Sequence, residues 1–382
     1  MSESRSVTIF SANYLPNIGG VERFTEGLAF ALAEAGVRVT IVTNNTFGLE
    51  TQENLAHGVD IVRLPCHPLI NGRMPLPKWT AGVKGLLDGL ARIPCDGVLI
   101  NTRFYIHTLL GLSYAKKMGL TPIVLDHGSA YLTFGNPVLD VFVRMYEHLI
   151  TAIVKRWKPL FYGISEKSVE WLGTFGIEAE GVISNSIDAA RYRAQASGRH
   201  FGFELGIEGE RLLLAFTGRL IPEKGIDVLV EMMRCLEGEP VDLVVAGDGP
   251  LRSRIEESCL DHVHLVGRLD QPDIAALLQE ADLFCLPTRS EGFSTSLLES
   301  AACGTPFLVT DVGGARELAP DESYGFVVNS ADSKLFASVV KDILHGSINL
   351  SQMGERCRLR AEEVCSWSSV ACSLLRAFGI TN

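Results

Sequence analysis

The chain has 382 residues, enough for two domains, and its 47% hydrophobic and 21% charged residues are typical of a globular protein rather than a disordered one. Its nine cysteines are odd in number and form no C-x-x-C pair, which favours reduced thiols over a disulfide framework or a zinc site. No apolar run approaches the roughly 18 residues that cross a bilayer, and no apolar segment precedes the first strand as a secretory signal would. We therefore expect a cytoplasmic protein that is soluble or peripheral on the inner face of the membrane.

The net charge of −11 is unevenly distributed. Residues 1–190 carry 16 basic against 17 acidic side chains, whereas the remainder carries 18 against 28. Within the first half, residues 61–120 hold eight basic and two acidic side chains. This segment is either an ordinary variation in surface charge or an attraction for phosphate or an anionic membrane surface. The stretch 144–159, where Trp157 lies within the basic run KRWK, supports the membrane alternative, and no nucleic-acid partner is expected.

Short β-branched runs, nearly continuous in apolar residues, recur along the chain as expected for strands buried on both faces of a parallel sheet. In the first half they occupy residues 7–12, 38–44, 59–65, 97–102, 121–126, 159–164 and 181–185. In the second half they occupy residues 212–216, 242–246, 262–266, 282–287, 306–310 and 325–328. Helical patterns such as GIDVLVEMMRCLEG lie between them. The alternation predicts an α/β fold with two doubly wound Rossmann-like domains.

The predicted domain boundaries follow from these two series. Residues 1–187 form the first domain and residues 205–360 the second, with the polar stretch 188–204 between them as a linker region. Residues 361–382 are expected to form a C-terminal helix, and the Pro-rich stretch 63–79 is expected to be a loop. Ligands of open α/β sheets bind beyond the carboxyl ends of the strands, so candidate site residues are sought directly after strands.

Three motifs of the first half follow strands. Gly19 and Gly20 precede a helix, where backbone N–H groups can approach an anion, although a simple turn explains them too. They match neither G-x-G-x-x-G nor a P-loop, so neither fingerprint is present. His127 ends the fifth strand in VLDHG and is either structural or part of a ligand site. Ser165 begins a helix without the Glu of a capping box, which predicts a simple N-cap.

Two basic residues follow the first strand of the second domain, in TGRLIPEKG. Arg219 lies just after the strand, and Lys224 comes directly before a helix. Cations oppose the macrodipole at a helix N-terminus, costing about 0.3–1 kcal/mol each, so their placement makes sense if an anion such as a diphosphate binds there. A surface ion pair of Lys224 with Glu223 or Asp227 is the alternative.

The stretch TRSEGFSTSLLESAACGTP predicts a loop followed by a helix that starts near residues 294–296 and stops at Gly304. Glu291 then lies in the loop and Glu299 in the first turns of the helix. Ser296 and Glu299 have the spacing of a capping box, which leaves Glu291 unexplained. Carboxylates are good acceptors for vicinal hydroxyls, so the two glutamates with a helix N-terminus between them fit a nucleotide-sugar clamp.

Taken in chain order, these motifs resemble the retaining glycosyltransferases of family 4, also called glycosyl transferases group 1. The resemblance rests on GGVER, DHG, GISE, SNSID, TGRLIPEKGIDVLV, VVAGDGPLR and the long segment from VHLVGRLDQ to GGARELAP, which together cover most of the chain. It implies the GT-B architecture, in which two Rossmann-like domains face each other across a cleft. The second domain would bind the sugar donor and the first the acceptor, and the final helix would cross back to the first domain.

The resemblance also implies roles for individual residues. Arg219 and Lys224 match the diphosphate-binding pair, Glu291 the acceptor of sugar hydroxyls, and Glu299 the acceptor of the ribose. His127 matches a histidine close to the transferred sugar, so the catalytic assignments are His127, Glu291, Arg219 and Lys224. The remaining donor-binding assignments are Gly19, Gly20, Gly292, Phe293, Ser294, Thr295, Ser296 and Leu297.

The expected activity is that of a hexosyltransferase-type enzyme. It would move a sugar from a UDP- or GDP-sugar to an acceptor, a glycan or a lipid-linked glycan, with retention of anomeric configuration. No D-x-D motif occurs, so neither a metal nor another cofactor is expected. The stretch SNSID at 184–188 departs from the family's usual Pro-Asn-Gly-Ile-Asp, which puts the conformation expected of the linker in doubt.

Three alternatives remain open from the sequence. A synthase of the same fold would use a small soluble acceptor such as a sugar phosphate. A nicotinamide-dependent oxidoreductase is disfavoured because G-x-G-x-x-G is missing. A nucleotide-sugar-binding module without catalysis is disfavoured because both glutamates and both basic residues are present.

Overall fold

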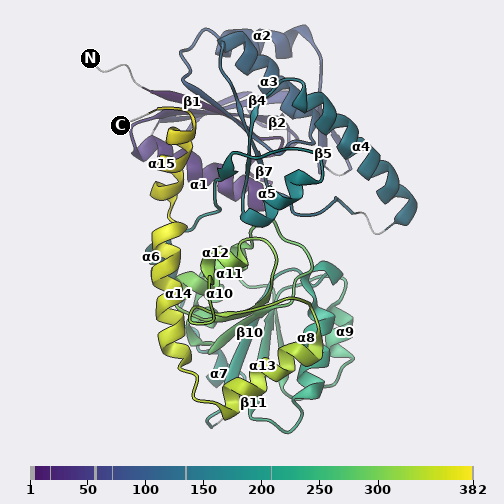
Figure 1. Ribbon diagram of the computed structural model, residues 1–382, viewed down its shortest axis with the longest axis vertical. Helices are drawn as coiled ribbons and strands as arrows, with labels where there is room; N and C mark the ends of the chain where they lie inside the picture. The colour runs from purple at the N-terminus through teal and green to yellow at the C-terminus, as the bar shows by residue number, and fades with distance from the viewer. Residues whose placement is uncertain are drawn as a thin grey trace. The chain divides into compact units, whose positions relative to one another are not determined.

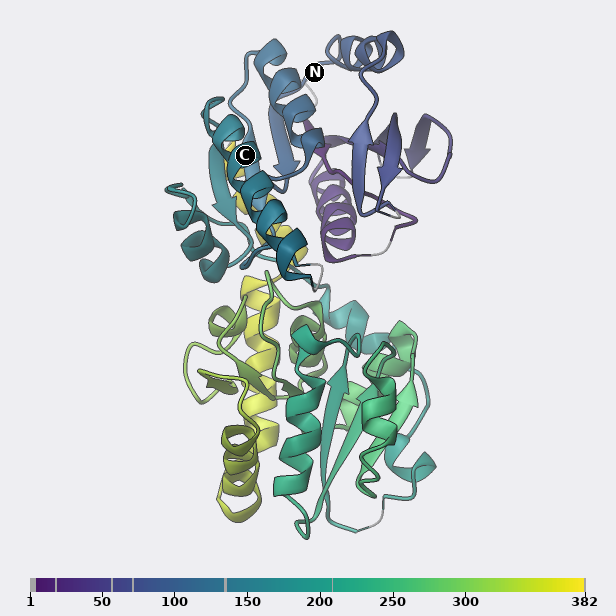
Figure 2. The ribbon, with the colours of Figure 1, turned by 90° about the vertical axis from the view of Figure 1, so that its right-hand side faces the viewer.

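The computed structural model describes residues 5–17, 19–55, 58–70, 72–133, 136–207 and 209–380. They divide into two compact units. Unit 1 contains the described residues up to Ser186 together with those from Trp367 onward, and unit 2 contains Ile187–Ser366. Figures 1 and 2 show that each unit is built on its own sheet with helices packed around it. The predicted α/β class with two Rossmann-like domains is confirmed.

The sheet of unit 1 has nine strands among the described residues, with β3-β4-β2-β1-β6-β7-β8-β9 in spatial order and β5 paired with β4. Strands β4, β2, β1, β6, β7, β8 and β9 pair in parallel, and β3 and β5 pair antiparallel with β4. The central strands are buried along their whole length because helices cover both faces. The strands are β1 (Ser6–Phe10), β2 (Arg38–Asn45), β3 (Gln52–Leu55), β4 (Val59–Leu69), β5 (Met74–Pro77), β6 (Gly97–Asn101), β7 (Ile123–Asp126), β8 (Leu160–Gly163) and β9 (Gly181–Val182).

The expectation of a loop over residues 63–79 is wrong. Strand β4 runs on to Leu69 and forms a hairpin with β5, in which Cys66 pairs with Pro77 and Leu69 with Met74. Pro75 and Pro77 are tolerated because β5 is an edge strand, where a missing N–H costs no sheet hydrogen bond. Pro68 lies in the part of β4 that pairs with β5 alone.

The helices of unit 1 include one from the far end of the chain. Helix α15 packs on α1, where an added Cβ at Gly27 would lie 2.2 Å from the ring of Trp367. Phe378 fits against Gly97 of β6 in the same way, since a Cβ there would lie 2.6 Å from its ring. The helices are α1 (Gly20–Glu34), α2 (Ala81–Leu90), α3 (Ile106–Met118), α4 (Pro137–Lys155), α5 (Glu166–Gly173) and α15 (Trp367–Ala377).

Unit 2 contains a sheet of six described strands, all parallel, in the order β12-β11-β10-β13-β14-β15. Each strand falls on one of the apolar runs seen in the sequence, so this part of the fold was predicted correctly. The strands are β10 (Leu212–Thr217), β11 (Val241–Ala246), β12 (Val263–Gly267), β13 (Leu283–Leu286), β14 (Phe307–Thr310) and β15 (Phe326–Val328).

The helices of unit 2 alternate with these strands, and α14 packs against α11, α12 and α6. Residues 361–364, which the sequence placed in the final helix, belong to α14 in unit 2. The helices are α6 (Ala189–Ala194), α7 (Phe201–Glu204), the 3-10 helix η2 (Pro222–Lys224), α8 (Ile226–Cys235), α9 (Arg252–Glu256), α10 (Gln271–Glu280), α11 (Thr295–Cys303), α12 (Ala315–Leu318), α13 (Ser333–His345) and α14 (Leu350–Val364).

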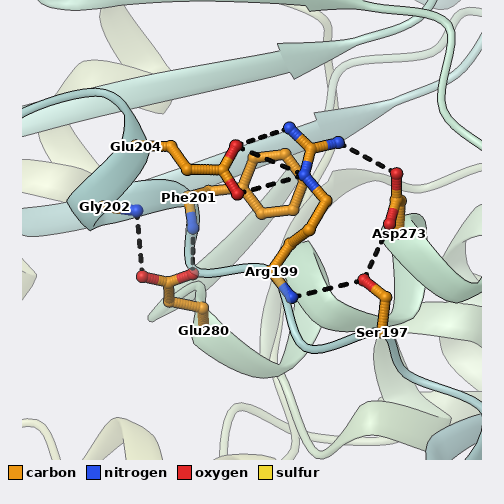
Figure 3. Close-up of polar contacts among 7 residues, drawn as sticks. All are labelled: Ser197, Arg199, Phe201, Gly202, Glu204, Asp273 and Glu280. Carbon is orange, nitrogen blue, oxygen red and sulfur yellow. Dashed lines mark hydrogen bonds and ion pairs between the residues drawn. The ribbon is translucent and has the colours of Figure 1, made fainter.

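The segment 188–204, expected as a linker, is folded into unit 2 by a polar cluster (Figure 3). Arg199 donates to Glu204 at 2.6 Å and to Asp273 of α10 at 2.9 Å. Glu280 at the end of α10 accepts from the backbone N–H groups of Phe201 and Gly202, at 2.6 and 2.9 Å. The polar composition that suggested a linker therefore supplies the side chains that hold this segment against α10.

Among the described residues, no helix is long and apolar enough to cross a membrane.

Candidate functional site

Two loops of unit 2 lie together because their strands are neighbours. Strands β10 and β13 pair in parallel, so the residues that follow them emerge at the same edge of the sheet. The backbone N–H of Arg289 and the hydroxyl of Thr288 both donate to the carbonyl of Glu223, at 2.8 and 3.0 Å. These bonds join the loop that carries Lys224 to the loop that carries Glu291.

Lys224 and Glu291 form an ion pair at this junction. Both side chains are largely buried, with 16% and 15% of their surface exposed. Oε1 of Glu291 also lies 3.2 Å from the hydroxyl of Thr288, whose single hydrogen it shares with the carbonyl of Glu223. Asp227, the other partner suggested for Lys224, instead binds Arg289 at 2.9 Å. The structure therefore brings together two predicted site residues that lie 67 positions apart in the chain.

Gly225 allows this close packing. Its φ of +71° lies in the left-handed region, and a Cβ there would approach the carbonyl oxygen of Pro287 to 2.0 Å. Any other residue would push the Lys224 turn away from the loop after β13.

A third loop, after β14, covers the segment that follows Glu291. A Cβ at Gly314 would lie 2.1 Å from the ring of Phe293, and one at Gly313 would lie 3.0 Å from the carbonyl oxygen of Gly292. Phe293 is buried. These two glycines were not singled out from the sequence, where the pair in DVGGA was the available signal.

Helix α11 begins at Thr295, within the expected range, but its cap differs from the capping box considered above. The N-cap is Ser294, whose hydroxyl accepts from the N–H of Leu297 at 3.4 Å. Ser296 lies inside the first turn, so it does not cap the helix with Glu299. Among the described acceptors, the N–H groups of Thr295 and Ser296 have no partner, and they remain available to a ligand anion.

The remaining site residues of unit 2 have contrasting surroundings. Glu299 is buried within α11, with 8% of its surface exposed. Arg219 lies directly after β10 and is exposed, and its guanidinium binds no acceptor among the described residues. Leu297 is buried, and its side chain faces the core. The predicted diphosphate pair thus comprises one paired lysine and one exposed arginine, on a single loop.

His127 of unit 1 lies at the carboxyl end of β7, in a hydrogen-bond chain. Thr25 donates its hydroxyl to the carbonyl of Val21 at 2.7 Å and therefore accepts from the amide nitrogen of Asn101 at 2.8 Å. The amide oxygen of Asn101 then faces Nε2 of His127 at 3.0 Å. This oxygen can only accept, so Nε2 carries the proton and Nδ1 is an acceptor.

Burial keeps His127 neutral. It lowers the pKa of His127 to about 3, and the ring of Phe24 packs edge-on against the imidazole with 5.0 Å between centroids. The side chain can therefore accept a hydrogen bond through Nδ1 at neutral pH but is not a cation there.

The residue before His127 belongs to a buried charge cluster. Asp126 accepts two hydrogen bonds from Arg103, at 2.7 and 2.8 Å, and Arg103 also binds Glu147 of α4 at 2.9 Å. All three side chains are almost fully buried, and burial raises the pKa of both carboxyls. Removing one partner of such a cluster typically costs about 3–5 kcal/mol, so the loop that carries His127 is firmly held.

The Gly-Gly turn before α1 contacts a carboxylate of its own helix. A Cβ at Gly19 would lie 2.3 Å from Oε2 of Glu22, whose other oxygen accepts from Asn17 at 3.0 Å. Burial raises the pKa of Glu22. Gly20 is exposed, and nothing lies within 4 Å of a Cβ placed there. An anion approaching this helix N-terminus would meet Glu22, which the sequence interpretation did not consider.

Ser165 confirms the simple N-cap. Its hydroxyl accepts from the N–H of Ser168 at 3.2 Å, at the start of α5.

Two family models match the chain in succession. Residues 18–191 match Glycosyltransferase Family 4, and residues 200–360 match Glycosyl transferases group 1. The chain belongs to these glycosyltransferases. The resemblance read from the sequence motifs is thereby confirmed, and the two matches fall on the two units in turn.

Individual glycosyltransferases resemble it over most of its length. One component of the human phosphatidylinositol N-acetylglucosaminyltransferase is 25% identical over 84% of this chain, which spans 65% of that relative's length. Glycogen synthase of Mycobacterium tuberculosis is 28% identical over a match that covers 94% of this chain and 91% of the glycogen synthase. Among solved structures, Anabaena HepE in complex with UDP-glucose has a TM-score of 0.72 at 17% identity, covering 98% of this chain and all of that one. This last similarity shows the GT-B fold.

Proposed function

We propose that this glycosyltransferase transfers a hexose from a UDP- or GDP-sugar to a glycan or lipid-linked glycan, with retention of anomeric configuration. The observation that carries the proposal is the ion pair of Lys224 and Glu291 beside the N-terminus of α11. A nucleotide sugar presents a diphosphate and vicinal hydroxyls side by side, and this pair offers a cation and a carboxylate side by side.

The diphosphate would be bound by groups of one loop and one helix. Lys224 and Arg219 supply positive charge, and the N–H groups of Thr295 and Ser296 supply donors where the helix dipole favours an anion. Because Lys224 already lies against Glu291, donor binding would redistribute its contacts from the carboxylate to the phosphate oxygens. Glu291 would then accept from sugar hydroxyls, and Glu299 from the ribose.

The same cations would promote transfer without a metal. Negative charge grows on the leaving diphosphate as the glycosidic bond breaks, and fixed cations stabilise that charge. Arg219 and Lys224 would do this in a front-face displacement, in which the leaving phosphate helps to deprotonate the acceptor. His127 would accept a hydrogen bond from a hydroxyl of the transferred sugar through Nδ1.

The acceptor is proposed from charge and from named relatives. The human relative is named for transfer to phosphatidylinositol, and the mycobacterial relative for glycogen synthesis. Unit 1 contains the basic segment 61–120, which would attract an anionic membrane surface and bring the enzyme to a lipid-linked acceptor. The second candidate is a cytoplasmic enzyme of the same fold that uses a small soluble acceptor. The fold similarity to HepE is compatible with either type of acceptor.

Thermal unfolding in the presence of UDP, GDP, ADP and NAD tests the donor class. A nucleotide at 100 times its Kd should add about 2.7 kcal/mol to the free energy of unfolding, and we expect this from UDP or GDP. Stabilisation by NAD alone would point to an oxidoreductase and contradict the proposal. A panel of sugar donors and acceptors, with products detected by mass spectrometry, then identifies the reaction.

Substitutions test the site itself. Lys224→Ala and Glu299→Ala should each lower kcat/KM by about ten- to a thousandfold, because each removes a charge-assisted contact to the donor. Lys334→Ala, an exposed lysine on α13, is the matched control and should leave the rate unchanged. Wild-type turnover in either site variant would contradict the assignment.

A further inference from the structure

Helix α4 exposes an apolar stripe. Val138, Phe142, Met145 and Leu149 have 62–68% of their surfaces exposed, and their spacing of four, three and four residues aligns them along one side of the helix. Val141 is 54% exposed beside them. We call these five residues the α4 stripe. Large apolar side chains exposed together, rather than singly, mark a surface that binds something.

The opposite side of α4 anchors it to unit 1. Ile150, Thr151 and Val154 are buried, and Glu147 binds Arg103 inside the unit. The hydroxyl of Tyr146 donates to the carbonyl of Phe104 at 2.7 Å. The stripe therefore belongs to a helix whose opposite side is already packed and hydrogen-bonded within unit 1. Figure 1 shows α4 along the outside of unit 1.

The charges of α4 are divided between its two sides. Glu147, one of its two acidic residues, is buried. The other, Asp140, accepts a hydrogen bond from Thr133, which precedes the helix, at 2.8 Å. Arg144 and His148 are exposed beside the stripe. All of α4 is described, and its exposed side combines apolar side chains with basic ones, whereas Asp140 is only partly exposed and is held by Thr133.

The carboxyl end of α4 adds further positive charge. Arg156, Trp157 and Lys158 are exposed, and Lys116 of α3 lies over the indole of Trp157 at 5.5 Å. These four residues line a pocket of about 520 Å³, and none of its described lining residues is acidic. Tryptophan beside lysine and arginine is typical of the boundary between lipid headgroups and acyl chains.

We propose that the α4 stripe inserts into a bilayer containing anionic lipid, with Arg156, Trp157 and Lys158 at the headgroups. The inference rests on the proposed function in one respect, since it locates the membrane contact proposed for unit 1. The stripe spans about 16 Å along the helix, and an interfacial helix of this kind lies in the membrane plane with its apolar side buried. The basic residues attract the anionic surface, while the stripe retains the protein there.

A bilayer fits this surface better than a protein does. A partner that covered the stripe would need acidic groups placed to meet Arg144 beside its middle and Arg156 beyond its carboxyl end, whereas an anionic headgroup layer supplies such groups everywhere. The apolar residues lie along one side of a helix, and they line neither the pocket at Trp157 nor the pocket at Trp79.

Vesicle cosedimentation of the full chain tests the proposal. The variant Phe142→Ser/Met145→Ser/Leu149→Ser should bind phosphatidylcholine–phosphatidylglycerol vesicles about a hundredfold more weakly than wild type, because three apolar side chains no longer enter the acyl region. The matched control is Phe203→Ser, which removes a side chain that is 90% exposed on unit 2 and should change nothing. Wild-type affinity in the triple variant, or no binding by the wild type, would overturn the proposal.

A second variant separates charge from insertion. Arg156→Ala/Lys158→Ala should weaken binding about tenfold at low salt and reduce its salt dependence, while quenching of tryptophan by brominated acyl chains disappears only in the triple variant. If the stripe were instead an interface between two copies, light scattering would show a wild-type dimer that the triple variant abolishes, with vesicle binding unaffected, and the proposal would fall.

Measuring nucleotide binding in the same variants separates the membrane proposal from the proposed enzymatic function. Stabilisation by UDP or GDP should be equal in wild type and triple variant, because the stripe lies outside the donor-binding residues. Loss of vesicle binding with nucleotide binding retained supports the stripe. A protein that binds vesicles through the stripe but binds no nucleotide would refute the proposed function alone.

Discussion

Single residues set the chemistry at the end of β7. The protonation state of His127 is set by Asn101, which lies 26 positions earlier in the sequence. The amide nitrogen of Asn101 donates to Thr25, so its amide oxygen faces the imidazole. Sequence reasoning identified His127 as a candidate but could not identify Asn101, which looks like any polar residue at the end of a strand. Asn101 is 2% exposed, so we regard it as a positioning residue that fixes the tautomer of His127.

Replacing this amide by a carboxylate should make His127 titrate. In Asn101→Asp, a negative charge about 3 Å from Nε2 favours the imidazolium, and the pKa of His127 should rise from about 3 into a range of roughly 4 to 6. The ring is then neutral above that pKa and cationic below it, so activity should fall on the acidic side at a higher pH than in wild type. NMR titration of the histidine ring measures the pKa directly.

The control for this change removes the hydrogen bond without adding charge. In Asn101→Leu the pKa of His127 should stay low, because burial is its cause. An unchanged titration in Asn101→Asp would show that Asn101 does not face the imidazole.

At the scale of elements, backbone contacts hold the loop after β10 against the loop after β13. The carbonyl of Glu223 accepts two bonds from the loop after β13, and Gly225 fits against Pro287 with no room for a side chain. The positions of Lys224 and Glu291 are thus set by the packing of main chain against main chain. The residues on either side of Lys224 supply these contacts, but their partners lie on the loop after β13, far away in the sequence.

Gly225→Ala should therefore disturb the site as well as the fold. It combines a left-handed φ of +71° with a backbone clash, and we expect a loss of at least about 2 kcal/mol in the free energy of unfolding. Gly238→Ala is the matched control, since Gly238 has a φ of +87° but nothing within 4 Å of its Cβ position. Denaturant unfolding should give the control only the conformational cost, about 1 kcal/mol. Equal losses in the two variants would contradict a steric role for Pro287.

The sequence predicted the parallel strands well and the antiparallel ones poorly. Continuous apolar runs mark strands covered on both faces, and every such run became a strand. Strands β3 and β5 escaped notice because QENL is polar and MPLP contains prolines. Both are edge partners of β4, where exposure and missing N–H groups are tolerated, so their sequences carry little strand signal.

The candidate site could be predicted in part for a similar reason. Candidate residues were sought directly after strands, and this rule identified Lys224 and Glu291 from the sequence. It did not predict that their side chains form an ion pair. The sequence left a capping box at Ser296 open, and the structure places the N-cap at Ser294 instead, two positions earlier, where a serine has the same capping ability. Contacts that depend on neighbouring strands, such as Gly313 with Gly292, leave no local trace in the sequence.

At the scale of the whole molecule, the chain passes between its two units twice. It leaves unit 1 after Ser186 and returns at Trp367, and the N–H of Ile187 donates to the carbonyl of Cys365 at 2.9 Å. The two crossing segments are therefore hydrogen-bonded to each other. As a result, unit 1 is completed only by the last residues of the chain.

Trp367 should therefore stabilise unit 1 although it lies far from the rest of that unit in sequence. Its ring fills the space above Gly27 and contacts Phe24 with 5.9 Å between centroids, so Trp367→Ala leaves a gap between α15 and α1. We expect a loss of about 2–4 kcal/mol, with faster amide hydrogen exchange in α1 and unchanged exchange in β10 of unit 2. Trp79→Ala removes an indole that is 68% exposed and should leave exchange in both units unchanged. Equal acceleration in α1 and β10 would instead mean that the two units unfold as one cooperative body, and the completion of unit 1 by α15 would then have no separate energetic consequence.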